Sequence, residues 1–325
     1  MNQFLKVIFG GLLAVTFGIA IGYGIVSFSR AGGFRSLGIN ISKLTSSARI
    51  AVSHPEDGTS ISGIVRTIRF SAVEEEDPIR AATEALDSSN HTSNGITARA
   101  YIVKNLSTGD IVTESNPNRL LPIASLTKLV TAIVAGRMLD PDSRMTITRE
   151  IMSSYGNTAS FKVGETLRVS DLLYPLLMVS SNDAAEALAR EYGRSKFIRA
   201  MNDFAQSIGA YRTYFADPSG LSSHNVSTVT DMSIILDWIR KNNPNILAIT
   251  ELKTKTVRSH TWVNPAHFLS WSNYLGGKNG YTPEANRTGA ALFHMGNKKE
   301  VYSVVVLGSE SRDDDVVRLL GKVVE

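Results

Sequence analysis

The sequence predicts an α+β fold in which strands lie near both ends of the globular part and helices fill its middle. Two short strand-like segments, residues 97–103 and 111–114, precede the helical region. Two more, residues 289–295 and 301–309, follow it. Because both pairs read as hairpins, we expect them to share one antiparallel sheet.

Turn-forming residues justify the two hairpins. Residues 105–110, Asn-Leu-Ser-Thr-Gly-Asp, connect the first pair of strands, and Gly296 and Asn297 lie between the second pair. Asparagine, aspartate and glycine suit such turns because they tolerate tight backbone conformations. A last short helix is expected over residues 313–323.

The helices between the strands are predicted from apolar periodicity and from end signals. An apolar run over residues 129–135 indicates a helix that is buried on most sides. Phe197, Met201, Phe204 and Ile208 lie on one helical face that Gly209 closes. Further helices are expected over residues 170–179, with a kink at Pro175, over 183–192 and over 230–241.

Composition excludes several classes of protein. The 325 residues are 43% hydrophobic, which is enough for a sizeable core, and the net charge of +4 is too small to indicate nucleic-acid binding. The absence of cysteine excludes disulfides, thiolate zinc sites and cysteine nucleophiles. Six histidines show no metal-ligand spacing, and we expect no cofactor.

The N-terminus carries a candidate membrane anchor. Residues 7–29 lack any charged side chain, and as a helix they would span about 34 Å, enough to cross a bilayer. The run is longer than the apolar part of a cleavable signal peptide, so we expect an uncleaved transmembrane helix. Lys6 lies on one side and Arg30 and Arg35 on the other, so charge does not decide the orientation.

We expect three regions along the chain. Residues 1–30 form an N-terminal tip and transmembrane anchor, residues 31–95 a stalk, and residues 96–325 the globular domain. The stalk is rich in serine and charged residues and shows no sustained period. Within it, residues 49–52 and 61–73 have the composition of short strands, and residues 74–86 that of a helix.

Ser125-Leu126-Thr127-Lys128 is a candidate pair of nucleophile and base. In a helix, residues three apart lie on the same face, so the lysine amine can reach the serine hydroxyl. A serine becomes a good nucleophile when a neighbouring base takes its proton, and a desolvated lysine can do this. The alternative is a serine that only caps the helix and a lysine that extends outward to solvent.

Two further motifs follow at defined distances. Ser180-Ser181-Asn182 lies in a short loop between two expected helices, 55 residues after Ser125. Lys278-Asn279-Gly280 begins an expected strand, 98 residues after Ser180. Each is weak alone, but their order and spacing carry a specific signal.

On these residues the chain resembles the penicillin-recognising serine enzymes, with their S-x-x-K, S-D-N and K-T-G motifs. Residues 163–165, 171–174, 183–185, 217–221 and 281–282 extend the resemblance to the low-molecular-weight D-alanyl-D-alanine carboxypeptidases of serine peptidase family S11. It runs from about residue 96 to the C-terminus. It implies a β-lactamase/transpeptidase-like fold with helices on both faces of the sheet and a helical subdomain.

The resemblance implies a role for each matched residue. Ser125 would form an acyl-enzyme and Lys128 would take its proton. Ser180 would relay a proton to the leaving amine, Asn182 would hold Lys128 and the substrate backbone, and Lys278 would add positive charge and help keep Lys128 neutral. The backbone N–H groups of Ser125 and Tyr281 would form the oxyanion hole.

Two positions qualify the resemblance. Asn279, which precedes Gly280, replaces the threonine that is usual in the family. A side-chain amide is therefore present where the family has a hydroxyl. We expect altered affinity for substrate or antibiotic rather than loss of acylation. Arg312 matches an arginine near the substrate carboxylate in the family. It could equally be a solvated charge that pairs with the acidic residues 313–315.

The implied function is a membrane-anchored carboxypeptidase that trims peptidoglycan stem peptides ending in D-Ala-D-Ala outside the cytoplasm, with β-lactams as covalent inhibitors. The sequence leaves open a D,D-endopeptidase acting on cross-links, and a non-catalytic wall-binding protein. A class A β-lactamase would need a glutamate after the Ser-x-Asn loop, and Glu191 is expected on a helix surface instead.

Overall fold

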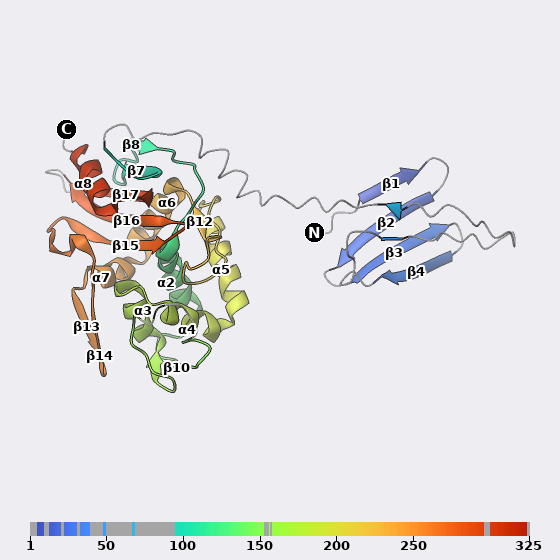
Figure 1. Cartoon of the computed structure of the whole chain (residues 1–325), viewed down its shortest axis with the longest axis horizontal. Helices are drawn as coiled ribbons and strands as arrows, with labels where there is room; N and C mark the ends of the chain where they lie inside the picture. Colours follow the sequence, from blue (N-terminus) through green and yellow to red (C-terminus); the bar gives the residue numbers. More distant parts are fainter. Residues whose placement is uncertain are drawn as a thin grey trace. The chain divides into compact units, whose positions relative to one another are not determined.

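The computed structural model describes residues 95–323 except 153–155, 157 and 296–299, and in residues 1–94 only the backbone of six strands. The chain divides into two compact units, residues 1–78 and 79–325 (Figure 1). The region boundaries expected at residues 30/31 and 95/96 stay predictions.

The first unit differs from the helix predicted over residues 7–29. An antiparallel sheet of order β1-β2-β3-β4 covers this segment, and β5 pairs with β6. Five glycines and many β-branched residues between positions 7 and 29 lower helix propensity and favour extended backbone. Among the described residues, no helix combines the length and the apolar character that crossing a bilayer requires. The bounds are β1 Leu5–Phe9, β2 Leu13–Ala20, β3 Tyr23–Arg30, β4 Gly33–Ile39, β5 Ala48–Arg49 and β6 Thr67–Ile68. The helix predicted over residues 74–86 lies outside the described residues.

A five-stranded antiparallel sheet forms the centre of the second unit, with strand order β15-β16-β17-β7-β8 (Figure 1). Within this unit, β7 and β8 come first in the sequence, most of the helices follow, and β15, β16 and β17 then complete the same sheet. This confirms the prediction that the N-terminal and C-terminal hairpins share one sheet. The strands are β7 Ala100–Asn105, β8 Ile111–Ser115, β15 Tyr274–Thr282, β16 Asn286–Met295 and β17 Glu300–Ser309.

Each face of this sheet packs against helices because side chains alternate along the strands. Ile102, Leu292 and Val305 belong to one buried cluster together with α2 (Thr127–Met138) and α6 (Val229–Asn242). Val103 and Val304 belong to a second cluster with α8 (Arg312–Gly321). Helices therefore cover both faces of the sheet, which confirms the predicted α+β arrangement.

The remaining elements include the predicted helices and several that the sequence patterns did not reveal. Pro175 lies inside α3, which begins and ends within a residue of the prediction. A helix, α7, and a hairpin, β13–β14, were not predicted. The helices are η2 Ala124–Leu126, α2 Thr127–Met138, α3 Val169–Met178, α4 Asn182–Tyr192, α5 Arg194–Ser207, α6 Val229–Asn242, α7 Pro244–Glu251, η3 His267–Ser270 and α8 Arg312–Gly321. The short strands are β9 Leu121–Pro122, β10 Arg144–Thr146, β11 Thr166–Arg168, β12 Val226–Ser227, β13 Thr254–Val257 and β14 His260–Val263.

Candidate active site

Ser125 lies in the single 3₁₀ turn that leads into the buried helix α2. The preceding residue, Ala124, has a φ of +47°, a left-handed conformation that costs an alanine free energy. Neighbouring segments hold this turn, because Ile123 donates its N–H to the carbonyl of Asn225 and accepts a hydrogen bond from the Thr288 hydroxyl. The serine is therefore fixed at a sharp, strained turn, as is common for functional residues.

Lys128 is fully buried one turn further along, and its amine meets three partners. Its Nζ lies 3.0 Å from Ser125 Oγ, 2.8 Å from Asn182 Oδ1 and 2.5 Å from the carbonyl oxygen of Ser219. The amide oxygen and the carbonyl can only accept hydrogen bonds, so they take the two N–H groups of a neutral amine. The lone pair then faces Ser125 Oγ, which is the one partner with a proton to give.

Burial and a second lysine favour this neutral form. Removal of Lys128 from water is the main cause that lowers its pKa, the positive charge of Lys278 lowers it further, and Asp217 opposes them. Burial also lowers the pKa of Lys278 to about 7, with a further contribution from Arg312. The spatial arrangement therefore excludes the alternative in which Lys128 extends outward to solvent.

The loop over residues 217–221 supplies the third partner of Lys128, and sequence reasoning gave it no role. Asp217 accepts hydrogen bonds from the N–H groups of Ser219, Gly220 and Ser222 and from the Ser219 hydroxyl, at 2.6–2.9 Å. The buried Asn225 joins this loop to Thr127 on α2. The Ser219 carbonyl is thereby held against Nζ.

Ser180 lies in the loop between α3 and α4, with its backbone in the left-handed region at a φ of +59°. Its Oγ is buried and has no hydrogen-bond partner among the residues that the structure describes. Together with Lys278 and Asn279 it lines a cavity of about 80 Å³. An unpaired buried hydroxyl is costly, so this group is suited to a substrate atom that fills the cavity.

Strand β15 brings the third motif to the nucleophile. Lys278 is buried and donates to the carbonyl of Asn279 at 2.8 Å. Gly280 runs so close to Ser125 that a Cβ there would lie 2.8 Å from its backbone nitrogen. Tyr281 follows, 62% exposed, with Arg287 over its ring. The expected oxyanion-hole residues thus lie on two segments in direct contact.

Arg312 forms the ion pair with an acidic neighbour that one of the two alternatives expected. Its guanidinium makes two hydrogen bonds of 2.8 Å to the Asp313 carboxylate, and its side chain packs against Gly289 of β16. Its charge also reaches the site, since it lowers the pKa of Lys278. A substrate carboxylate is not needed to give Arg312 a partner, so its role in binding stays a prediction.

Asp183 is a buried carboxylate that the predicted site did not include. It is fully buried at the start of α4, and neither of its oxygens has a hydrogen-bond partner among the described residues. Loss of hydration raises its pKa from 3.8 to about 6. Because the folded state holds this proton more tightly than the unfolded chain, stability declines as the pH rises through about 6.

We therefore expect Asp183→Asn to raise the free energy of unfolding at pH 7.5 by about 1–3 kcal/mol, with little gain at pH 4. The amide has the shape of the protonated acid but cannot ionise. Urea denaturation of both proteins at the two pH values checks this. An equal difference at both pH values would show that the carboxylate does not titrate with folding.

The spatial arrangement defines a class of site in which a serine hydroxyl lies within hydrogen-bond distance of a buried lysine amine whose pKa is lowered. The family model described as "D-alanyl-D-alanine carboxypeptidase", peptidase S11, matches residues 87–310, and the chain belongs to this family. The D-alanyl-D-alanine endopeptidase of Pseudomonas aeruginosa is 37% identical over 139 residues, which are 42% of this chain and 45% of that protein. The chain thus aligns with less than half the length of this relative.

Solved structures agree with the fold. A D-alanyl-D-alanine carboxypeptidase from Mycobacterium tuberculosis superposes with a TM-score of 0.66 at 26% identity, over 72% of this chain and 94% of that one. Penicillin-binding protein D2 from Listeria monocytogenes, in its cefotaxime-bound form, gives 0.65 at 25% identity, over 72% and 100%. The β-lactamase/transpeptidase-like fold expected from the three motifs is therefore confirmed.

Proposed function

We propose that this protein is a serine-type D-alanyl-D-alanine carboxypeptidase that trims peptidoglycan stem peptides. The observation that supports this most directly is the buried Lys128 amine, whose Nζ lies 3.0 Å from Ser125 Oγ and within hydrogen-bond distance of two oxygens that can only accept. Family membership supplies the substrate class. A non-catalytic wall-binding protein would not need this arrangement, since burying a lysine among acceptors costs stability.

The proposed reaction uses these residues in order. Ser125 Oγ attacks the carbonyl carbon between the two terminal D-alanines while Lys128 Nζ takes the hydroxyl proton. The backbone N–H groups of Ser125 and Tyr281 stabilise the oxyanion. The carbon–nitrogen bond then breaks, and the leaving amine receives a proton through Ser180, beside the charge of Lys278. Water finally hydrolyses the ester on Ser125.

The test is release of D-alanine from a peptide that ends in D-Ala-D-Ala. We expect wild type to release it and Ser125→Ala to release none, and fluorescent penicillin to label only wild type. Absence of both D-alanine and label from wild type would exclude the enzyme and leave the binding protein. A label on Ser125→Ala would mean that another residue is acylated.

An endopeptidase is the second candidate, and the similarity to the Pseudomonas aeruginosa endopeptidase favours it. Both reactions use the same acylation chemistry, so only the substrate separates them. A cross-linked peptide dimer, supplied beside the D-Ala-D-Ala peptide, decides between them. Cleavage of the dimer without release of D-alanine would make the endopeptidase the better description.

Asn279 is expected to weaken the grip on the substrate carboxylate. It lines the same cavity as Ser180 and Lys278, but its amide is longer and planar, whereas a threonine hydroxyl can rotate to its acceptor. We expect Asn279→Thr to speed acylation by fluorescent penicillin by up to about tenfold, the value of one charge-assisted hydrogen bond. An unchanged or slower rate would show that residue 279 does not contact the carboxylate.

We also propose that residues 7–29 attach the protein to the cell membrane, with the catalytic unit outside. The length of this uncharged segment and the location of the substrate polymer support the proposal. In lipid the segment would have to be helical, so that its backbone N–H and C=O groups form hydrogen bonds within it.

Because the chain has no cysteine, single cysteines can be introduced at Gln3 and Glu284 to test this proposal. An impermeant maleimide should label Glu284→Cys and not Gln3→Cys in intact cells; the reverse pattern, or a protein absent from membranes, contradicts the proposal.

A further inference from the structure

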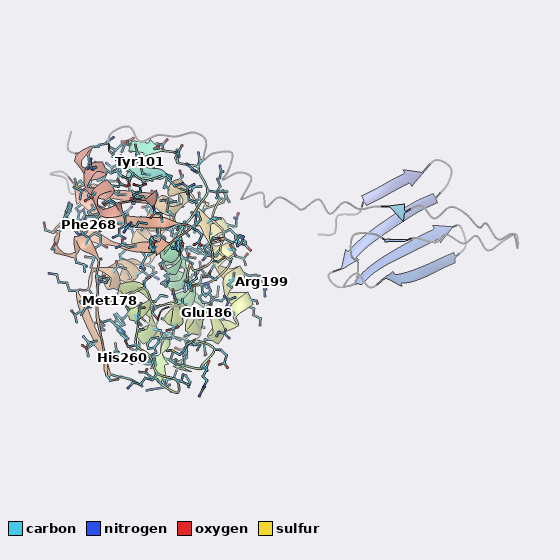
Figure 2. The ribbon with its side chains drawn as sticks, in the orientation of Figure 1. Tyr101, Met178, Glu186, Arg199, His260 and Phe268 are labelled. Atoms are coloured by element: carbon cyan, nitrogen blue, oxygen red, sulfur yellow. The ribbon has the colours of Figure 1, made fainter. Side chains whose placement is uncertain are left out.

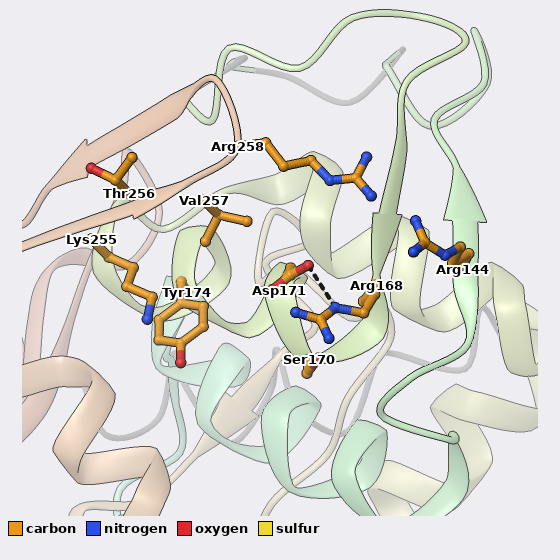
Figure 3. Close-up of a pocket in the computed structure, with 9 residues that line it drawn as sticks. All are labelled: Arg144, Arg168, Ser170, Asp171, Tyr174, Lys255, Thr256, Val257 and Arg258. Carbon is orange, nitrogen blue, oxygen red and sulfur yellow. Dashed lines mark hydrogen bonds and ion pairs between the residues drawn. The ribbon is translucent and has the colours of Figure 1, made fainter.

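A cleft of about 480 Å³ lies apart from the residues proposed for catalysis, between the hairpin β10–β11, the start of α3 and the hairpin β13–β14. Figure 3 shows Arg144 and Arg168 entering it from the first hairpin and Lys255 and Arg258 from the second, with Tyr174 of α3 beneath Lys255. Four cationic side chains therefore line one concave surface.

The cations in the cleft are poorly neutralised. Arg168 uses the only lining carboxylate, Asp171, at 3.2 Å, and also approaches Asp142 at 3.6 Å. Lys255 Nζ lies 4.2 Å from the centre of the Tyr174 ring, and Arg258 donates to the carbonyl of Thr166. Among the described residues, none of Arg144, Lys255 and Arg258 has a carboxylate within ion-pair distance. An anion would supply the missing charge.

Two local features of the cleft are unfavourable in the absence of a ligand. Arg144 and Arg168 are directly opposite each other across β10 and β11, and like charges in such a pair destabilise a sheet. Arg258 occupies the two-residue turn of β13–β14 at a φ of +51°, where asparagine or glycine is favoured. Arginines placed against local preference indicate a function for their charge.

The cleft and the catalytic cavity share two walls. Helix α3 runs from Tyr174 at the cleft to Leu177 and Met178 at the cavity, which is about 6 Å along the helix axis at 1.5 Å per residue. The chain that leaves β14 continues into residues 264–266, which line the same cavity as Ser180 and Lys278. An extended peptide of three to five residues, at about 3.3 Å each, covers such a distance.

We propose that this cationic cleft is a second binding site of the enzyme, which takes carboxylates of an acidic peptide whose D-alanyl end reaches Ser125. The inference rests on the proposed peptidase function. Arginine suits this task because its planar guanidinium binds a carboxylate through two parallel hydrogen bonds. The cleft thereby adds affinity for acidic substrates without touching the bond that is cut.

The test compares two substrates of equal length that end in D-Ala-D-Ala, one neutral and one with two carboxylates upstream. For wild type at low salt we expect kcat/KM to be about tenfold higher on the acidic peptide, with the difference in KM. Arg144→Gln with Lys255→Gln should abolish this preference and leave kcat/KM on the neutral peptide unchanged.

The matched control is Lys196→Gln with Arg199→Gln, which removes the same charge from the exposed surface of α5. Figure 2 places Arg199 on the opposite side of the unit from His260 and its hairpin. This control should keep the preference. Equal loss in both double variants would mean that only the overall charge matters, and a preference retained without Arg144 and Lys255 would also overturn the proposal.

Failure of the inference is distinguishable from failure of the proposed function. If wild type cleaves neither peptide, the peptidase function is wrong, and binding is then measured by titrating Ser125→Ala with an acidic peptide that lacks the D-alanyl end. Saturable binding that the cleft variant loses supports the site, and absence of binding overturns it. Binding of a glycerol phosphate oligomer in the cleft without binding of the acidic peptide would assign the site to a phosphate polymer and overturn the proposal.

Discussion

Replacing Lys128 with methionine is expected to lower the rate of acylation of Ser125 by about 10²- to 10⁴-fold, the usual contribution of a positioned general base. Methionine keeps an unbranched side chain in the space but removes the amine that lies 3.0 Å from Ser125 Oγ. The rate constant for labelling by fluorescent penicillin measures this directly. The D-Ala-D-Ala peptide gives a second measurement, with the loss in kcat rather than in KM.

The stability of the same variant relative to wild type should depend on pH. A lysine whose pKa is lowered by burial destabilises the fold, because the unfolded chain binds its proton more readily. This cost is largest at low pH and shrinks as the pH rises, so the gain in the free energy of unfolding from Lys128→Met should be greater at pH 6 than at pH 9. The opposite trend would mean that Lys128 is charged in the folded protein.

A control separates loss of the base from general damage to the helix. Thr131 lies one turn further along α2, is fully buried, and donates its hydroxyl to the carbonyl of Pro218. Thr131→Val removes this hydrogen bond next to the loop that supports Lys128 but leaves the amine in place. It should lower stability by about 1 kcal/mol and change acylation far less than Lys128→Met. Equal losses of acylation in the two variants would contradict a specific role for the amine.

The regular elements of the fold could be predicted because their signals are local. The spacing of Phe197, Met201 and Phe204 predicted α5, and the apolar, β-branched run in residues 301–309 predicted β17. The hairpin β13–β14 was not predicted, because its turn is Arg258-Ser259 and lacks the asparagine or glycine that usually marks such turns. Helix α7 has only eight residues and too few turns to show a period.

The predicted site residues could be grouped because the motifs are side-chain patterns at fixed spacing. The structure brings Ser125, Lys128 and Asn182 into one hydrogen-bonded group and places Ser180 and Lys278 on one cavity. The contact between Lys128 Nζ and the Ser219 carbonyl could not be predicted from the sequence. Every residue has a backbone carbonyl, so the residue type does not indicate which one accepts this hydrogen bond. The side-chain amide of Asn225 ties the supporting loop to α2, and no sequence motif gave this residue a role.

Gly220→Ala is expected to abolish acylation or to lower the free energy of unfolding by more than about 4 kcal/mol. Gly220 has a φ of +86°, and a Cβ there would lie 1.9 Å from the carbonyl oxygen of Ala124 and 3.0 Å from the nitrogen of Ser125. Those atoms are backbone, so no side chain can rotate away. Either the 217–221 loop moves off α2, or the turn that carries Ser125 moves.

Gly209→Ala is the matched control for this steric effect. Gly209 has nearly the same φ, +89°, but nothing lies within 4 Å of the position that a Cβ would take. Its replacement therefore imposes only the conformational cost of a left-handed alanine, about 1–2 kcal/mol. Urea denaturation and penicillin labelling of the two variants separate strain from collision. If both variants lost similar stability and kept acylation, the close approach of Gly220 to the nucleophile turn would not position Ser125. If instead only Gly220→Ala lost acylation, this contact would be what holds the serine against Lys128.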